Sequence, residues 1–281
     1  MTGQSASWRL CLKAFYFTAS ALTLTAGLSA AALAQALPKT SPESVGLSSE
    51  RLNRLTETFQ HDVGAGEIPG AVVLIARNGK IAYEQAFGYQ NREDKVAMKT
   101  DAIFRIASMS KPITSVAVMM LVEEGKIDPA APVSQYLPEF KDVRVGAERA
   151  PAQRPMTVQD LLRHTSGLTY GVFAADPSVK QAYDDAKVFS FDQSLAEMVT
   201  KLSKLPLVRQ PGSAWEYSMS TDVLGRIVEV ASGMEFDRFV QERITGPLNL
   251  TATGFWVDPA RADKIAEPQV DPASGKRPSM I

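Results

Sequence analysis

The stretch FRIASMSKPITS, residues 104–115, marks the point where a strand-like pattern gives way to a helical one. Pro112 fits the first turn of a helix, where no backbone N–H is needed from it. Gly125 follows as a typical helix stop. Apolar residues recur near one stripe between these two positions: Ile113, Val116, Met120 and Leu121. The stretch therefore predicts that Ser108 lies at the start of an amphipathic helix.

Ser108 and Lys111 form an S-x-x-K pair within this stretch. Residues three apart share one face of a helix, so the Lys111 amine can reach the Ser108 hydroxyl. A serine hydroxyl becomes a good nucleophile only when a neighbouring base takes its proton. A partly desolvated lysine can take that proton, or it can stabilise a phenolate that does so. S-x-x-K alone is a weak signal, and its position at a helix start is what makes Ser108 a candidate nucleophile.

Two apolar runs upstream predict a β-hairpin over residues 71–89. AVVLIAR and KIAYEQAFGY are rich in β-branched and aromatic residues, and Asn78-Gly79 joins them. Asn-Gly tolerates the positive φ angles of a tight hairpin turn. Residues 48–63 predict a helix capped by Ser48 or Ser49 and broken from Gly64 onward. Residues 35–47 predict an extended linker.

The chain downstream of Gly125 predicts helices separated by loops. Residues 129–155 are proline-rich and predict little regular structure beyond a short turn at 133–136. Thr157 and Asp160 have the spacing of a capping box on a short helix that ends near His164, with Gly167 as a stop. Further helices are predicted over residues 192–204, 221–231 and 235–244. No internal repeat is present, and the layout is one early hairpin followed by a mostly helical stretch.

Composition excludes several classes of protein. The 281 residues include 30 Lys and Arg and 31 Asp and Glu, giving a net charge of −1. A nucleic-acid binder needs a basic stripe to displace counterions from phosphates, and this chain has none in its sequence. Two histidines and one cysteine are too few ligands for a zinc finger or an iron–sulfur cluster. We expect no metal and no organic cofactor.

The N-terminal residues 1–34 predict a signal peptide. Arg9 and Lys13 form a positive segment, an uncharged run follows, and Ala32-Leu33-Ala34 provides small residues for cleavage before Gln35. The expected localisation is periplasmic or secreted. An uncleaved inner-membrane anchor is the alternative, because the run is long enough to span a bilayer. Cleavage would remove Cys11 and leave a mature chain without cysteine.

Tyr217 is a second candidate for chemistry. It lies between predicted helices in Pro211-Gly212-Ser213-Ala214-Trp215-Glu216-Tyr217-Ser218 and is flanked by small residues and tryptophan. By itself it is equally a packed aromatic or a functional phenol. Known motifs such as G-x-S-x-G, H-E-x-x-H and the P-loop are absent from the sequence.

Four segments together resemble the serine β-lactamase-related hydrolases. They are FRIASMSKPITS, LVEEGKIDPAAPVSQYLPEF (121–140), MTVQDLLRHTSGL (156–168) and QPGSAWEYSMSTDVLGRIVE (210–229). This family includes class C β-lactamases, D-alanyl-D-alanine peptidases and family VIII carboxylesterases. The resemblance covers about 42–270 and implies Ser108 as the acylated nucleophile, with its backbone N–H as an oxyanion donor. It implies Lys111 and Tyr217 as the base system, and it does not decide which of them takes the proton.

One departure from the family concerns Met219. Where β-lactamases carry Tyr-x-Asn, this chain has Tyr217-Ser218-Met219. A thioether cannot replace the hydrogen bonds of an asparagine amide. The Tyr-Ser-hydrophobic form is similar to that of the esterase branch. Met219 as a plain core residue is an equal alternative.

A second departure is a missing motif. The family carries Lys- or His-[Ser/Thr]-Gly on a late β-strand, well beyond Tyr217, and Ile281 follows Tyr217 by only 64 residues (281 − 217). His164-Thr165-Ser166-Gly167 has similar letters, but it precedes Tyr217, and we interpret His164 as a structural hydrogen bonder. The late strands that pair with the hairpin, and the second oxyanion donor they carry, are therefore expected to be missing. Loss of one such donor typically costs about 10²–10³ in rate.

These observations predict an α/β (α+β) fold of the β-lactamase/transpeptidase type over residues 48–281, incomplete at its C-terminus. The expected activity is hydrolysis of a small ester through an acyl-enzyme on Ser108. Amide or β-lactam hydrolysis is the alternative, including carboxypeptidase activity. A different class, an inactive fragment or an exported protein that binds cell-wall peptides or a partner, is the rival hypothesis. The expected partner is a small-molecule substrate, with no nucleic acid and no membrane beyond the N-terminal segment.

Overall fold

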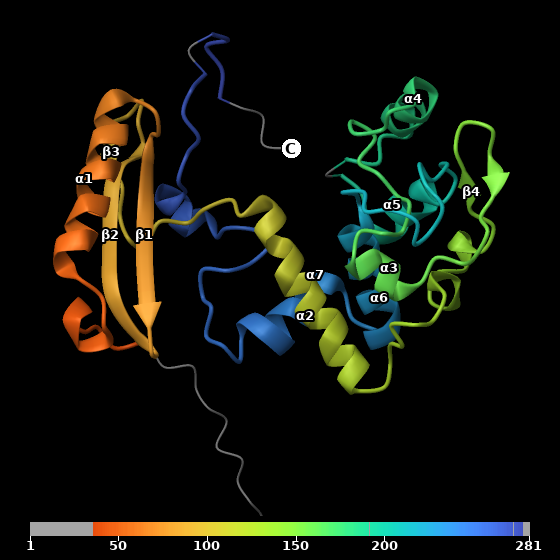
Figure 1. Cartoon of the computed structure of the whole chain (residues 1–281), viewed down its shortest axis with the longest axis horizontal. Coiled ribbons are helices and arrows are strands. Elements are labelled where there is room, and N and C mark those ends of the chain that lie inside the picture. The colour runs from red at the N-terminus through yellow and green to blue at the C-terminus, as the bar shows by residue number, and fades with distance from the viewer. Residues whose placement is uncertain (1–35, 191, 272, 278–281) are drawn as a thin grey trace, which may run out of the picture. The chain divides into compact units, whose positions relative to one another are not determined.

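The computed structural model describes residues 36–190, 192–271 and 273–277, so the predicted signal peptide at 1–34 lies outside the described residues. The predicted hairpin is confirmed: β1 (Gly70–Arg77) pairs antiparallel with β2 (Lys80–Asn91) (Figure 1). Asn78 and Gly79 both have positive φ, 52° and 69°, as the tight turn requires.

The sheet has more strands than the two expected. β3 (Val96–Ala97) pairs with the end of β2, and Lys39 pairs with Ile81 at its beginning. The linker predicted over residues 35–47 is therefore more than extended chain, since its described part, from residue 36 onward, reaches the sheet at Lys39 and includes the 3₁₀ helix η1 (Pro42–Val45). Among the residues that the structure describes, β1 pairs only with β2.

Helix α1 (Ser49–Ala65) packs against the hairpin. Ser48 caps it, as predicted, by accepting a hydrogen bond from the Arg51 N–H at 3.3 Å. The ring of Phe59 stacks on that of Phe87 at 5.2 Å. The helix ends two residues later than expected, because Gly66 rather than Gly64 adopts the left-handed conformation, with φ of 81°.

The helix predicted after residue 107 is α2 (Ser110–Glu123), preceded by the 3₁₀ turn η2 (Ala107–Met109). Gly125 follows it with φ of 68°, as expected of a helix stop. The preceding residues 104–106 form no strand, contrary to the prediction. The reason is that the C-terminal segment meets this stretch at a single bridge, between Ile103 and Ile265.

The proline-rich region contains short elements only, as predicted. They are the 3₁₀ helices η3 (Val133–Gln135) and η4 (Pro138–Phe140) and the two-residue strands β4 (Arg144–Val145) and β5 (Ala150–Pro151). The next helix, α3 (Val158–Leu162), begins with the predicted Thr157–Asp160 capping box.

Four helices follow, and one of them was not predicted. That helix is α4 (Pro177–Ala186), whose start carries a readable signal: Asp176 caps it and Pro177 occupies its first position. The other three lie within or near the predicted ranges: α5 (Leu195–Leu202), α6 (Ser220–Ser232) and α7 (Phe236–Val240). Two are shorter than predicted, because Ser194 caps α5 late and α7 passes into the π-helical turn η5 (Gln241–Thr245).

The last described segment runs back to the sheet. After the 3₁₀ helix η6 (Pro259–Lys264), the Ile103 N–H donates to the Lys264 carbonyl at 2.7 Å, and the Glu267 N–H donates to the Gln90 carbonyl at 2.7 Å. The Gln90 side chain also donates to the Asp263 carbonyl. This segment therefore ties the end of β2 to the chain leading into η2.

The hydrophobic core lies among the helices, where α2 packs against α6 and α6 contacts α3, α5 and α7. Its fully buried members include Val118 and Leu121 of α2, Leu224 and Ile227 of α6, and Phe239 of α7. The helix α2 is thus fixed by apolar burial on the side opposite its exposed residues Val116 and Met119. Of the helices described, none combines the length and hydropathy needed to cross a membrane.

A buried carboxylate organises the region around α3. Asp160 accepts two hydrogen bonds from Arg154, at 2.7 and 2.8 Å, and others from Thr157 and Thr165. Burial by itself raises the pKa of Asp160, but these donors outweigh it and hold the pKa at about 2. Thr165 in turn accepts the Gly212 N–H at its carbonyl, at 2.7 Å, so the network also anchors the loop before α6.

We expect Asp160→Asn to destabilise the fold by about 2 kcal/mol near neutral pH, the value that corresponds to the depressed pKa. Because the folded pKa lies below that of the unfolded chain, the stabilisation is complete above pH of about 4 and is lost as the pH falls toward about 2. Urea unfolding of both proteins at several pH values measures this difference, with exposed Asp184→Asn as control. A difference that stays constant from neutral to acidic pH would contradict the assignment.

Candidate active site

Ser108 lies in the η2 turn immediately before α2 and is exposed. The residue before it, Ala107, has φ of 42°, a left-handed conformation that costs an ordinary residue about 1–2 kcal/mol. Ser108 precedes α2, so its backbone N–H lies outside the hydrogen bonds of that helix. Among the described residues this N–H meets no backbone acceptor, so it is free to bind a ligand oxygen.

Tyr217 reaches Ser108 from the loop between α5 and α6. The backbone of this loop is tied to the turn after α3, because the Glu216 N–H donates to the His164 carbonyl at 2.8 Å. Behind Tyr217, the hydroxyls of Ser218, Ser220 and Ser166 form a buried hydrogen-bonded chain, with distances of 2.8 and 2.7 Å. These contacts fix the backbone on both sides of the phenol.

The three predicted site residues come together in the structure. The Ser108 Oγ lies 2.6 Å from the Tyr217 hydroxyl, and the Lys111 Nζ donates to the Ser108 Oγ at 3.3 Å. Lys111 also lies over the Tyr217 ring, with its Nζ 4.7 Å from the ring centroid. The serine hydroxyl is therefore within hydrogen-bond reach of both candidate bases.

Lys111 and Tyr217 shift each other's pKa in directions that favour their charged forms. Burial lowers the pKa of Lys111, but hydrogen bonds to the oxygens of Tyr217 and Tyr170 raise it above its ordinary value overall. The hydrogen bond from Lys111, followed by that from Ser108, lowers the pKa of Tyr217. Lys111 is thus held as a cation, and Tyr217 gives up its proton more readily than a free tyrosine.

Tyr170 is a site residue that the sequence did not reveal. Its ring meets that of Tyr217 edge-on, with centroids 5.1 Å apart, and lies 5.7 Å from the Lys111 Nζ. Burial raises the pKa of Tyr170, and the negative charge of Asp222 raises it further, so Tyr170 stays neutral. Its only sequence signal is its place three residues after Gly167.

Neither His164 nor Met219 forms a hydrogen bond to Ser108 among the described residues. The His164 Nδ1 lies 3.3 Å from the Ser218 Oγ, and burial, together with the charge of Lys111, lowers the pKa of His164. It is a structural hydrogen bonder, as interpreted from the sequence. Met219 is 3% exposed and belongs to the core, which agrees with its interpretation as a packing residue.

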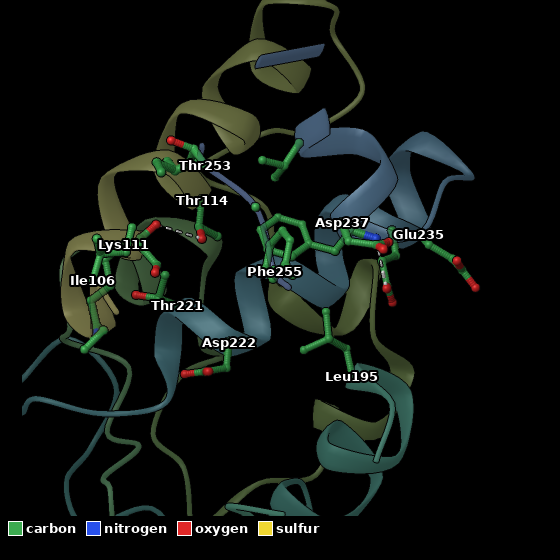
Figure 2. A pocket seen from close by; sticks show the side chains of 18 of the residues that line it. Ile106, Lys111, Thr114, Leu195, Thr221, Asp222, Glu235, Asp237, Thr253 and Phe255 are labelled. Atoms are coloured by element: carbon green, nitrogen blue, oxygen red, sulfur yellow. Dashed lines mark hydrogen bonds between the residues drawn. The ribbon is translucent and has the colours of Figure 1, made fainter. Parts of the chain in front are cut away.

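A cavity of about 650 Å³ lies behind Lys111, between the start of α2, helices α6 and α7, and residues 253–255 (Figure 2). Lys111 and Asp222 line it, whereas Ser108 and Tyr217 do not. Asp222 is exposed as a residue, but the protein packed around its carboxylate raises its pKa. The sequence did not predict Asp222 as a cavity residue. An acidic residue in the first turn of a helix is common, because it interacts favourably with the helix dipole. No three His, Cys, Asp or Glu side chains among the described residues are grouped to hold a metal ion.

The chain is similar to known proteins over most of its length. The chain is 36% identical over 211 residues to esterase EstB of Burkholderia gladioli, covering 72% of this chain and 51% of the relative. It is 34% identical over 242 residues to a putative D-alanyl-D-alanine carboxypeptidase of Salmonella agona (strain SL483), covering 83% of this chain and 54% of the relative. The chain therefore spans about half the length of the curated relatives it matches.

A solved structure supports the same fold. The structure of EstCE1, described as a hydrolase with promiscuous acyltransferase activity, matches this chain with a TM-score of 0.69 and 29% sequence identity. The match covers 80% of this chain and 58% of the EstCE1 chain. This match confirms the predicted β-lactamase/transpeptidase-like fold. A family model described as Beta-lactamase matches residues 55–279, most of the chain. The chain therefore belongs to the Beta-lactamase family of serine hydrolases.

Proposed function

We propose that the protein hydrolyses a small ester through an acyl-enzyme formed on Ser108. The observation that carries the proposal is the 2.6 Å contact between the Ser108 Oγ and the Tyr217 hydroxyl, with the Lys111 Nζ 3.3 Å from the same serine oxygen. A hydroxyl held this close to two basic groups has no purpose in a protein that only binds a partner. This arrangement favours catalysis over the binding hypothesis.

Tyr217 is the base in this mechanism, and Lys111 is its electrostatic partner. The pKa of Tyr217 is lowered while that of Lys111 is raised, so a phenolate beside a lysine cation is the reactive form. The phenolate takes the Ser108 proton while the Oγ forms a bond to the ester carbonyl carbon. The Ser108 N–H donates to the oxyanion that results.

Collapse of the tetrahedral intermediate breaks the bond to the alcohol oxygen. Tyr217 returns its proton to that oxygen, and the alcohol leaves. Water then attacks the acyl group on Ser108, with Tyr217 taking the water proton and passing it to the serine oxygen. The products are the carboxylic acid and the alcohol, and the enzyme regains its starting state.

An ester is favoured over an amide or β-lactam substrate. Met219 occupies the position of the asparagine in Tyr-x-Asn, and its buried thioether offers the substrate no hydrogen bond. The names of EstB and EstCE1 as an esterase and a hydrolase agree with this choice. The Salmonella relative carries a carboxypeptidase name, so a chromogenic β-lactam belongs in the same assay as a competing substrate.

Incubation with a fluorophosphonate is expected to add one adduct to the purified chain, on Ser108, visible by intact-mass spectrometry. The Ser108→Ala variant is expected to give no adduct and to lose ester hydrolysis by at least about 10³-fold. Exposed Ser213→Ala, in the loop before Tyr217, is the matched control. A folded wild-type chain that stays unmodified would favour the binding hypothesis instead.

Tyr217 is expected to ionise before the other tyrosines in an ultraviolet pH titration of tyrosinate absorbance. Its pKa is lowered by Lys111 and Ser108, whereas burial raises the pKa of Tyr170 and of Tyr183. Tyr217→Phe should remove this earliest step, and Lys111→Met should move it to higher pH. An earliest step that survives Tyr217→Phe would assign the low pKa to another phenol.

We also propose export with cleavage after Ala34, supported by the charged start, the uncharged run and the small residues that precede Gln35. Expression of the full chain in a bacterium with a periplasm, followed by N-terminal sequencing, is expected to give Gln35 as the first residue. Recovery of the intact N-terminus in the membrane fraction would support the anchor instead.

A further inference from the structure

Exposed aromatic side chains gather around Tyr217. Trp215 is 65% exposed and Phe173 is 57% exposed. The ring of Trp215 stacks nearly parallel to that of Tyr217, with centroids 6.0 Å apart and an interplanar angle of 12°. The ring of Phe173 lies 6.3 Å from that of Tyr217. We call Trp215 and Phe173, with the face of Tyr217 between them, the aromatic surface.

The fold does not need this surface for its core. Trp215 and Phe173 come from two separate loops, one before α6 and one before α4, and neither belongs to the buried cluster that joins the helices. Large apolar side chains left open beside a reactive hydroxyl are typical of a ligand site. The one ring that both side chains share is that of the candidate base.

The chemistry decides which part of an ester meets the aromatic surface. The group that returns a proton to the leaving oxygen must lie within hydrogen-bond reach of that oxygen. In the mechanism above this group is the Tyr217 hydroxyl, so the alcohol oxygen is bound there as it leaves. The remainder of the alcohol then extends along the Tyr217 ring, where Trp215 and Phe173 flank it.

We propose that Trp215 and Phe173 bind the alcohol portion of the substrate and favour esters of aromatic alcohols over esters of small alkyl alcohols. This inference rests on the proposed esterase function and adds a substrate class to it. Offset or edge contacts between aromatic rings are favourable beyond simple burial of area, and loss of one such partner typically changes binding about tenfold.

Two acetates that differ only in the alcohol, benzyl acetate and ethyl acetate, test the selectivity. The ratio of their kcat/KM values is expected to fall about tenfold in Trp215→Ala, mainly through KM for benzyl acetate. Trp215→Phe should keep most of the ratio because it retains a ring. Trp256→Ala is the matched control, since Trp256 is 74% exposed but lies outside the aromatic surface, and it should leave the ratio unchanged.

Binding without chemistry is measured in the Ser108→Ala variant. Benzyl alcohol is expected to change its tryptophan fluorescence saturably, and adding Trp215→Ala should abolish that change. If the wild type hydrolyses neither acetate but the fluorescence change is present, the proposed function fails and the alcohol site stands. If hydrolysis occurs with a ratio that Trp215→Ala does not alter, the inference is overturned and the proposed function stands.

A second copy of the chain could cover the same side chains. In that case Trp215→Ala would lower the mass measured by sedimentation and leave the ester ratio unchanged. That result would also overturn the inference.

Discussion

The packing of α2 against α6 is the constraint on which the site depends. Ser108 and Tyr217 are 109 positions apart in the chain, yet their oxygens are 2.6 Å apart. Ser108 precedes α2 directly and Tyr217 stands three residues before α6, so the interface between these helices sets the distance. Fully buried residues such as Leu121 and Leu224 make that interface. A change of packing there would therefore be felt first as a lengthened hydrogen bond at the site.

The electrostatics of the site follow from the same interface. Lys111 points from the first turn of α2 toward two phenols, and Asp222 stands in the first turn of α6 on the cavity that Lys111 also lines. The charge of Lys111 favours ionisation of Tyr217 and of Asp222, while burial opposes ionisation of Asp222 and of Tyr170. One cation thus faces several potential anions, and Tyr217 is the one whose oxygen contacts the Ser108 Oγ. Of these three groups only Tyr217 has a lowered pKa, whereas the pKa values of Tyr170 and Asp222 are raised, so the group beside the nucleophile is the one whose ionisation is favoured.

Much of this arrangement could be predicted from local sequence, because the responsible interactions are local. The Asn78-Gly79 turn, the Ser48 cap and the Thr157–Asp160 capping box each depend on residues within a few positions of one another. The approach of Lys111 to Ser108 is also local, since both lie in one helical turn. The local sequence around Tyr217 left it equally a packed aromatic or a functional phenol. Only the family resemblance predicted that it belongs to the site.

The remaining features depend on contacts between distant segments, which periodicity does not reveal. Tyr170 reaches Lys111 only because the turn after α3 is folded back onto the loop before α6, through the His164 and Thr165 carbonyls. Residues 104–106 form no strand, although their composition favours one, because pairing with the C-terminal segment does not extend beyond the bridge of Ile103 to Ile265. Helix α4 was missed for a different reason: its Asp176-Pro177 start is a local signal, but the apolar stripe behind it is short.

The Asp160 network links stability to the position of the aromatic side chains. Asp160 holds Thr165, and the Thr165 carbonyl holds Gly212, five residues before Tyr217. The same turn leads within a few residues to Tyr170 and Phe173, whose rings also lie against that of Tyr217. One buried carboxylate therefore fixes both loops that meet at the phenol. Since a site must be held within a fraction of an ångström to be effective, the burial of Asp160 serves the geometry of Tyr217 as well as the folding of α3.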